Sequence, residues 1–202
     1  GLTLTGALVV DGGTVKLDGN YPVGTGNVAL GDTALDSVEA GGTCNVAIGH
    51  HAGTAITTGD DNTAIGALSL DANTTGSKNT AVGHLSLSSN TEGLENTGLG
   101  RSALFTNTTG DNNVAVGRLS LFSNTTADNN TALGYQSLCA NTTGGANTAV
   151  GYSALDSNTT GYANVAIGCD ALQTNTAGFH NVAVGENSLE LNDSGDQNVA
   201  IG

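Results

Sequence analysis

Hydrophobic and polar residues follow a short cycle that repeats along almost the whole chain. A cycle opens with Asn and continues with Val or Thr, Ala, an aliphatic residue and Gly. It carries a Leu four positions after the Gly, and the exceptions are Gly98 in place of the Ala and Gly53 in place of the Leu. The first step between cycles is 18 residues and each later step is 17. A fixed short period indicates a protein in which one small unit stacks on the next. The opening asparagines are Asn27, Asn45, Asn62, Asn79, Asn96, Asn113, Asn130, Asn147, Asn164, Asn181 and Asn198.

We number the unit 1 to 17 from its asparagine, and its pattern predicts β-structure. Positions 1 to 4 alternate, with Val or Thr and an aliphatic residue on one side and Ala on the other, as in a strand. A second strand is expected through positions 7 to 10, which include the Leu. Position 5 and the Asn-Thr-Thr-Gly tendency at positions 12 to 15 predict two turns. The position-5 glycines are Gly31, Gly49, Gly66, Gly83, Gly100, Gly117, Gly134, Gly151, Gly168, Gly185 and Gly202.

Two strands and two turns close one coil, so the fold class is an all-β parallel β-solenoid. Coils pairing in parallel at ~4.8 Å make a rod of roughly 50 Å. Each position becomes a column, and the asparagines are expected to form a ladder whose amides bond along the rod and satisfy turn backbone groups. Residues 27–202 hold ten repeats of 17–18 residues and the start of an eleventh. Residues 1–26 do not repeat and are expected to form a β cap or connector at the edge of the first coil.

Large side chains are scarce, and this favours association of several chains. There is no Trp, no Met and only 3% aromatic residues. Each coil therefore has few large apolar residues to bury, and a single rod is marginally stable. Either of two columns could meet a partner, and the sequence does not decide between them. One is the Val/Ile column, and the other contains Ala29, Ala47, Ala64, Ala81, Ala115 and Ala132.

Charge and cysteine content exclude several partners. The formal net charge is −14 with only four Lys and Arg, which argues against binding to nucleic acid or to anionic membrane surfaces. No apolar run is long enough for a transmembrane helix, so membrane insertion is not expected. Cys44, Cys139 and Cys169 have no metal-binding spacing and are predicted to be free thiols.

The variable columns are where binding chemistry would lie. At position 10, Phe105 precedes Phe122, and at position 16, Tyr162 precedes Phe179. Neighbouring rings in a column are expected to stack, and the alternative is a strip that binds sugars. Arg101 and Arg118 share position 6 and are expected to be neutralised by acidic neighbours.

No catalytic, cofactor-binding or metal-binding residue is assigned, and the chain is interpreted as non-enzymatic. The carboxylate pairs that glycoside hydrolysis requires do not gather across neighbouring coils. A metal site at the histidines would need a carboxylate that the sequence does not place. Calcium in the acidic turns is the one cofactor left open. The residues considered are Asp32 with Asp36, Glu186 with Glu190, His50, His51, His84, His180, Asp60 with Asp61, and Asp193 with Asp196.

Ice binding is a further function that the same fold serves. A regular column of threonine hydroxyls could face ice. Two points argue against this interpretation: the column lies in an expected turn, and most of its threonines are followed directly by another Thr. Two consecutive residues cannot both project from one flat strand face. The column comprises Thr57, Thr74, Thr91, Thr108, Thr125, Thr142 and Thr159.

The repeats resemble two families. The NVAIG and NVAVG segments at Asn45, Asn113, Asn164 and Asn181 are similar to the head repeats of trimeric autotransporter adhesins, which implies a left-handed parallel β-roll of three chains and a role in attachment. The coils of that family are shorter, so the 17-residue period of this chain is a departure from the resemblance. The fuller pattern NTAxGxxxLxxNTTGxx resembles tail-fibre and appendage repeats of tailed phages, particularly cyanophages, as does the lead-in from Val9 to Gly31.

These resemblances imply a homotrimeric fibre. The first expectation is the structural shaft of a phage tail fibre or virion appendage that positions a receptor-binding end, with other virion proteins as partners. The alternative is a bacterial cell-surface adhesin head that binds host matrix or cells through a surface glycan or protein. The C-terminal NVAIG has no cap, and a further domain is expected to follow it.

Overall fold

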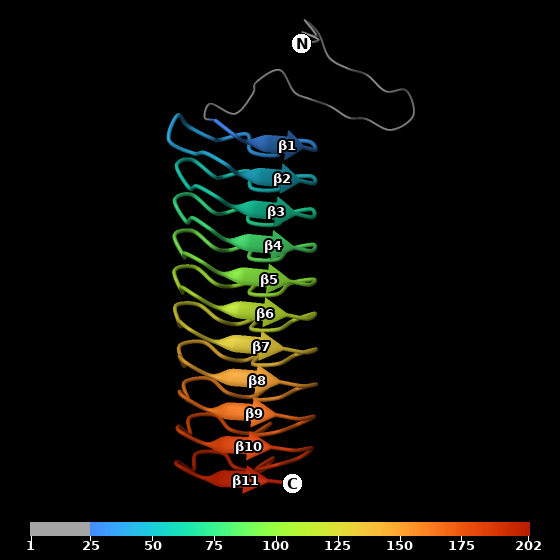
Figure 1. Cartoon of the computed structure of the whole chain (residues 1–202), viewed down its shortest axis with the longest axis vertical. Coiled ribbons are helices and arrows are strands. Elements are labelled where there is room, and N and C mark those ends of the chain that lie inside the picture. The colour runs from blue at the N-terminus through green and yellow to red at the C-terminus, as the bar shows by residue number, and fades with distance from the viewer. Residues whose placement is uncertain (1–24) are drawn as a thin grey trace, which may run out of the picture.

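The computed structural model describes residues 25–202, which wind into a rod with one flat side (Figure 1). The regular elements of this part of the chain are eleven strands of three residues, each at positions 2 to 4 of a repeat. They are β1 (Val28–Leu30), β2 (Val46–Ile48), β3 (Thr63–Ile65), β4 (Thr80–Val82), β5 (Thr97–Leu99), β6 (Val114–Val116), β7 (Thr131–Leu133), β8 (Thr148–Val150), β9 (Val165–Ile167), β10 (Val182–Val184) and β11 (Val199–Ile201).

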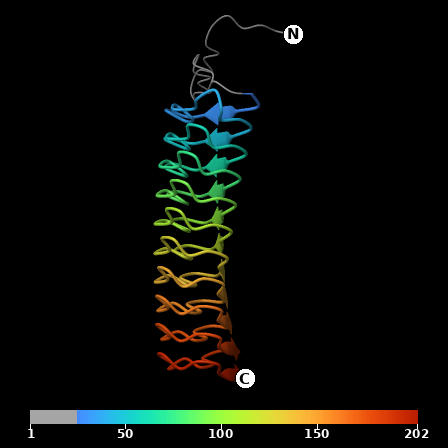
Figure 2. The same cartoon turned by 90° about the vertical axis from the view of Figure 1, so that its left-hand side faces the viewer.

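The strands form one parallel sheet in sequence order from β1 to β11. Equivalent positions pair, so that Ala64 lies beside Ala81. The 18-residue first repeat keeps this register, since Val28 pairs with Val46. Figure 2 shows the strands along one side of the rod and the turns along the other. The prediction of an all-β parallel β-solenoid is confirmed.

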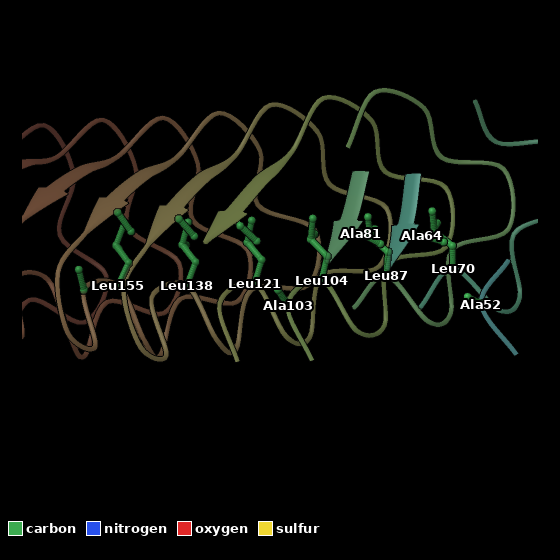
Figure 3. Close-up of a cluster of buried hydrophobic side chains, with 14 of the residues drawn as sticks. Ala52, Ala64, Leu70, Ala81, Leu87, Ala103, Leu104, Leu121, Leu138 and Leu155 are labelled. Atoms are coloured by element: carbon green, nitrogen blue, oxygen red, sulfur yellow. The ribbon is translucent and has the colours of Figure 1, made fainter. Parts of the chain in front are cut away.

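The core is a double column of alanines and leucines inside the coils. The position-3 alanine of each coil points inward from the sheet, and the position-9 leucine reaches it from the opposite wall (Figure 3). Both Ala81 and Leu87 are fully buried. A coil this thin has room for a large side chain from only one wall, because interiors are close-packed. The small residue at position 3 therefore lets the sheet approach the leucines.

The glycine at position 5 makes the turn after each strand, as predicted. Gly83 has φ of +131°, in a region that L side chains rarely adopt. A Cβ at this position would lie 2.7 Å from the carbonyl carbon of Gly100 in the next coil. Both the backbone conformation and the close stacking of coils therefore require glycine here.

The prediction of a second strand through positions 7 to 10 is wrong. This segment is a series of turns in which the residues at positions 7 and 9 have positive φ, as in Leu68 (57°) and Leu70 (49°). Because of the positive φ values, the N–H groups at positions 7 and 9 point to opposite neighbouring coils. The N–H of Leu68 donates to His50 in the preceding coil at 2.9 Å, and that of Leu70 donates to Ser86 in the following coil at 3.1 Å. Burial of the leucine and these bonds offset the cost of the left-handed conformation, about 1–2 kcal/mol per residue.

The second coil fills its core differently. Position 9 holds Gly53 instead of Leu, and position 12 holds Ile56 instead of the Asn found in later coils. Ile56 is fully buried, and a Cβ on Gly53 would lie only 2.9 Å from its Cδ1 atom. The isoleucine thus occupies the space that a leucine takes elsewhere.

The expected cap lies outside the described residues, except for Thr25 and Gly26, and it stays a prediction. In the part of the chain that the structure describes, there is no helix of the length and apolar character needed to cross a membrane.

Candidate interaction surfaces

The opening asparagines lie one above another and bond along the rod. In a typical step, the backbone N–H of Asn79 donates to Oδ1 of Asn62 at 3.0 Å. The Asn79 side-chain Nδ2 donates to the Gly93 carbonyl at 2.8 Å, in the turn that closes the same coil. One side chain thus joins its coil to the next and holds its own turn closed. The amide is needed for both roles, since a carboxylate could only accept.

A second asparagine ladder, which the sequence reasoning missed, runs at position 12. Nδ2 of Asn107 donates to Oδ1 of Asn90 at 2.8 Å and to the Gly110 carbonyl at 3.0 Å. The signal was present in the recurrent Asn of Asn-Thr-Thr-Gly, which we interpreted only as a turn residue. No side-chain nitrogen or oxygen that is buried within residues 25–202 lacks a hydrogen-bond partner. The ladder is formed by Asn73, Asn90, Asn107, Asn124, Asn141, Asn158, Asn175 and Asn192.

The outward side of the sheet is the larger of the surfaces. We call it the sheet face, and it consists of positions 2 and 4 of β1 to β11. Position 2 is Val or Thr and position 4 is Leu, Ile or Val in every strand, so the face has no charged side chain. Ile65 is 36% exposed and Leu133 is 40% exposed. Of the two columns that the sequence left open, the alanine column is buried and the Val/Ile column faces outward.

Positions 6, 7 and 10 lie near one another at the turn that follows the strand. The rings of His50 and His51, at positions 6 and 7, have centroids 4.0 Å apart. Gln173 at position 10 donates from Nε2 to Oδ1 of Asp170 at position 7, at 2.8 Å. Side chains at these three positions therefore meet within a coil.

The expected aromatic stacking is confirmed. Phe105 and Phe122 stack with centroids 5.1 Å apart. Tyr162 and Phe179 stack at 4.9 Å. In each pair the two rings cover one face of each other. A ligand could not insert between them and would meet mainly the ring edges. Stacking along the rod explains these aromatics without a sugar.

The expectation that acidic neighbours neutralise Arg101 and Arg118 is wrong. Within residues 25–202 the ion pairs are Lys78 with Glu95, at 3.1 Å, and a longer contact of His50. Arg118 instead lies over the ring of Tyr135, 5.6 Å from its centroid, and Tyr135 stacks on Tyr152. Both guanidinium groups are exposed. The carboxylates of these coils lie at position 16, before the strand, whereas the arginines lie after it.

The histidines have one neighbour that the sequence did not place. Nε2 of His50 lies 3.9 Å from Oδ2 of Asp32, the position-6 residue of the preceding coil. In the described chain, however, no three His, Cys, Asp or Glu side chains gather where they could hold a metal ion. His84 is exposed in the same column, and His180 lies edge-on to Tyr162 and Phe179.

Acidic side chains of the turns accept hydrogen bonds from the coil before them. Oδ1 of Asp60 accepts from Thr43 N at 2.7 Å, and Oδ1 of Asp193 accepts from Thr176 Oγ1 at 2.7 Å. Oδ1 of Asp196 accepts from Phe179 N at 2.9 Å. These acids tie coils together. The pairs considered for hydrolysis, Asp32 with Asp36 and Glu186 with Glu190, lie in the first and tenth repeats, at opposite ends of the rod.

The threonine column considered for ice binding is also used within the rod. Oγ1 of Thr108 donates to the carbonyl of Thr125 at 3.0 Å, and the same bond recurs along the column. The hydroxyl hydrogens are thus occupied by backbone carbonyls of the next coil.

All three cysteines are free thiols. Burial raises the pKa of the Cys139 thiol to about 11, with a smaller contribution from the nearby Asp156 carboxylate. A hydrogen bond with Asp170 raises the pKa of Cys169. Burial, aided by Asp170, also raises the pKa of the Asp156 carboxyl. Raised thiol pKa values oppose thiolate formation at neutral pH, which is the opposite of a nucleophilic site.

Comparison of the chain with protein-family models, with curated proteins and with solved structures found no match.

Proposed function

We propose that this chain is a structural shaft: a stiff spacer built from several parallel copies, a homotrimer, in a fibre. The observation that supports this most directly is the sheet face, an uncharged strip of aliphatic residues and threonines that runs the length of the described rod. From the strand spacing and residue rise, eleven strands of three residues give a face ~50 Å long and ~10 Å wide, or ~500 Å². Apolar patches of this size on a soluble protein commonly mark contact with another protein.

The distribution of charge supports the same proposal. The chain has 18 Asp and Glu, and positions 2 and 4 contain none of them in any strand. Depletion of charge is typical of the centre of protein interfaces. Packing of sheet faces around a common axis would remove this surface from water and add the apolar burial that each thin coil lacks on its own.

Stiffness follows from the bonds between coils. Every coil is joined to the next by the strand pairing, by the position-1 asparagine and, from Asn73 onward, by the position-12 asparagine. These bonds are buried, and a bend would have to break several of them together. A spacer has to hold its ends apart, and this construction does so without a catalytic group or a cofactor.

The proposed location is a virion appendage, as the resemblance to phage tail-fibre repeats implies, with other virion proteins at its ends. The alternative is the head of a bacterial surface adhesin. One observation favours this alternative: the middle of the rod carries exposed rings and cations, such as Tyr152 and Arg118, that a plain spacer does not need. Such side chains are frequent at binding hot spots.

The test of the shaft is the mass of the protein in solution. Light scattering on the full chain is expected to give three chains per particle. The double variant Leu99→Lys, Leu133→Lys places two cations on the sheet face and is expected to give monomers with an unchanged circular dichroism spectrum. The matched control Thr109→Lys, Thr126→Lys changes two exposed position-14 residues and is expected to keep the wild-type mass. A monomeric wild-type chain would contradict the proposal.

A binding assay separates the two locations. The assembled rod alone, labelled and added to candidate host cells or extracellular matrix, is expected not to bind if it is only a spacer. Saturable binding that is lost on Tyr152→Ala, while light scattering still gives the wild-type mass, would instead support the adhesin.

A further inference from the structure

Two exposed arginines without carboxylate partners need an explanation in so acidic a chain. Lys78, Arg101 and Arg118 are the only Lys and Arg of residues 25–202, and Lys78 alone is paired with a carboxylate. Arg101 and Arg118 lie in successive coils of one column, where like charges repel. Carboxylates supplied from outside this chain would relieve that repulsion and pair with both groups.

Each coil presents two edges beside the sheet face. We call position 6, two residues after the strand, the leading edge. We call positions 16 and 17, just before the next strand, the trailing edge. Figure 1 shows these two sets of turns at opposite ends of the arrows. An arginine and the carboxylates of its own coil are therefore separated by the width of the sheet.

The two edges of the middle coils carry opposite charges. In the coil of 96–112 the leading edge has Arg101 and the trailing edge has Asp111. In the coil of 113–129 the same positions hold Arg118 and Asp128. The trailing edge of the coil before them ends in Glu95. Charge is thus matched between edges, coil by coil.

In one coil the two edges also match in size. In the coil of 130–146, the leading edge has the large Tyr135, whereas the trailing edge has Gly145 and Ala146. The next coil has Tyr152 on the leading edge, and its trailing edge combines the large Tyr162 with the small Ala163. The match in size is therefore confined to the coil of Tyr135.

The acidic side chains are held in place before any partner arrives. Oδ1 of Asp111 accepts from the backbone N–H of Leu94 at 2.7 Å, and Oδ1 of Asp128 accepts from that of Asp111 at 2.7 Å. These bonds leave Oδ2 of each aspartate available for a guanidinium. Fixed carboxylates lose little freedom when they pair, which strengthens recognition.

We infer that the leading edge of one copy packs against the trailing edge of the next, with Arg101 and Arg118 paired to Glu95, Asp111 and Asp128 of that second copy. This rests on the proposed fibre of several chains and adds which edges meet, in which direction and at which height. The copies run parallel and in axial register.

Symmetry supports the parallel arrangement. When sheets pack around an axis along the rod, the leading edge of each copy meets the trailing edge of its neighbour. Antiparallel copies packed sheet to sheet would instead bring leading edge to leading edge, and arginine to arginine. Complementary charges fix direction and register more than they add affinity.

The charges also limit sliding of one copy along another in one direction. Position 6 lies within one coil rise, ~4.8 Å, of position 16 both in its own coil and in the preceding one. Arg101 can therefore reach Glu95 or Asp111, and Arg118 can reach Asp111 or Asp128. A slip of two coils one way would bring Arg118 to Gly145 or Tyr162, where no carboxylate is in reach. A slip of two coils the other way would bring Arg101 to Lys78 but also to Asp60 and Asp61, and the charges do not oppose it.

Cross-linking tests which edges meet. Two full-length chains with Cys44, Cys139 and Cys169 changed to Ser are prepared with different tags, one with Arg118→Cys and the other with Asp128→Cys. They are refolded together and treated with a short bis-maleimide. Covalent pairs that carry both tags are expected, and pairs of two Arg118→Cys chains are not.

Charge variants test which groups pair. Arg101→Glu with Arg118→Glu is expected to weaken assembly at least tenfold, measured by light scattering on dilution. Asp111→Asn with Asp128→Asn keeps an oxygen for the backbone bonds and removes only the charge, so the fold should persist while assembly also weakens. Circular dichroism checks the fold of each variant.

The outcomes separate this inference from the proposed function. Assembled chains that give only pairs of Arg118→Cys chains, or no cross-link, would overturn the edge pairing and leave the fibre intact. Assembly unaffected by both charge variants would overturn the role of the ion pairs. A monomeric wild-type chain would overturn both the pairing and the fibre.

Discussion

The sheet face and the edges beside it are built from the same coils, yet they differ in how much their sequence varies. Position 4 is a branched aliphatic residue in all eleven strands, whereas position 6 includes Asp32, His84, Arg118, Tyr152 and Glu186. The uniform column would fit any copy at any height. The variable column differs from coil to coil, so it can favour some heights of a partner over others. The difference suggests that the sheet face supplies contact area and the edges supply register.

The largest expected loss of stability comes from a substitution in the position-5 glycine column, where neighbouring coils are in closest contact. Gly134→Ala places a side chain where φ is +135° and where a Cβ would lie 2.7 Å from the carbonyl carbon of Gly151. Strain and overlap together should cost about 4 kcal/mol, measured by urea unfolding. Gly145→Ala in the same coil is the control, because its nearest neighbour would be at 3.1 Å and its φ is not positive. Equal losses from both changes would contradict the argument.

Removing one rung of the asparagine ladder should cost somewhat less. Asn113→Ala leaves the buried N–H of Asn130 without its acceptor and removes one of the two amide donors to the Ala127 carbonyl, which keeps Nδ2 of Asn124. One unsatisfied buried donor and one further lost hydrogen bond should together lower the free energy of unfolding by about 3 kcal/mol, again by urea unfolding. Thr126→Ala, at an exposed site of the same coil, should change it by less than about 0.5 kcal/mol.

A pair of changes within β8 sharpens the comparison of its two sides. Ala149 points into the core and is fully buried, whereas Val150 points out onto the sheet face. Ala149→Val should destabilise each chain by about 2 kcal/mol through overpacking. Val150→Ala should leave the stability of the separate chain nearly unchanged and reduce assembly. Thermal unfolding and light scattering measure the two effects.

The smallest effect concerns Asp156 at position 10. Its pKa is raised by burial and by Asp170, so the fold favours the protonated form. As the pH rises through the ordinary aspartate pKa toward the raised value, the folded chain loses stability relative to the unfolded chain. Asp156→Asn should therefore stabilise the protein at pH 7 by a fraction of a kcal/mol, since the group is half-exposed and screened. At pH 3 the difference should vanish, which denaturation at both pH values would check.

The sequence was sufficient for the features that depend on local chemistry. The Gly at position 5 of every repeat, such as Gly83, and the Asn at position 1, such as Asn79, can each be interpreted from a single repeat. The regular 17-residue period then predicts that equivalent residues stack. The segment around Leu70 could not be predicted, because its left-handed conformation is stabilised by bonds to two other coils. The orientation of Ala81 was also open, since alternation defines two sides of a strand without saying which one the closing chain covers.

The opposite charges of the two edges were hidden for a related reason. Arg118 and Asp128 lie in one repeat, so their proximity in sequence suggested neutralisation within the chain. The strand between them holds them apart in the folded coil, and this separation is the basis for the proposed pairing with a second copy.

The second coil has Gly53 where other coils have Leu, and Ile56 where later coils have Asn. These two differences have a consequence for how the rod unfolds. Ile56 fills the interior of the second coil, but the position-12 amide chain then begins only at Asn73. The first two coils are therefore fastened by one row of asparagines and the remainder by two. Local unfolding should start at the N-terminal end of the repeats and advance coil by coil. It should stop where the second asparagine ladder begins. Amide protons before Asn73 should accordingly exchange with solvent sooner than those in the middle of the rod.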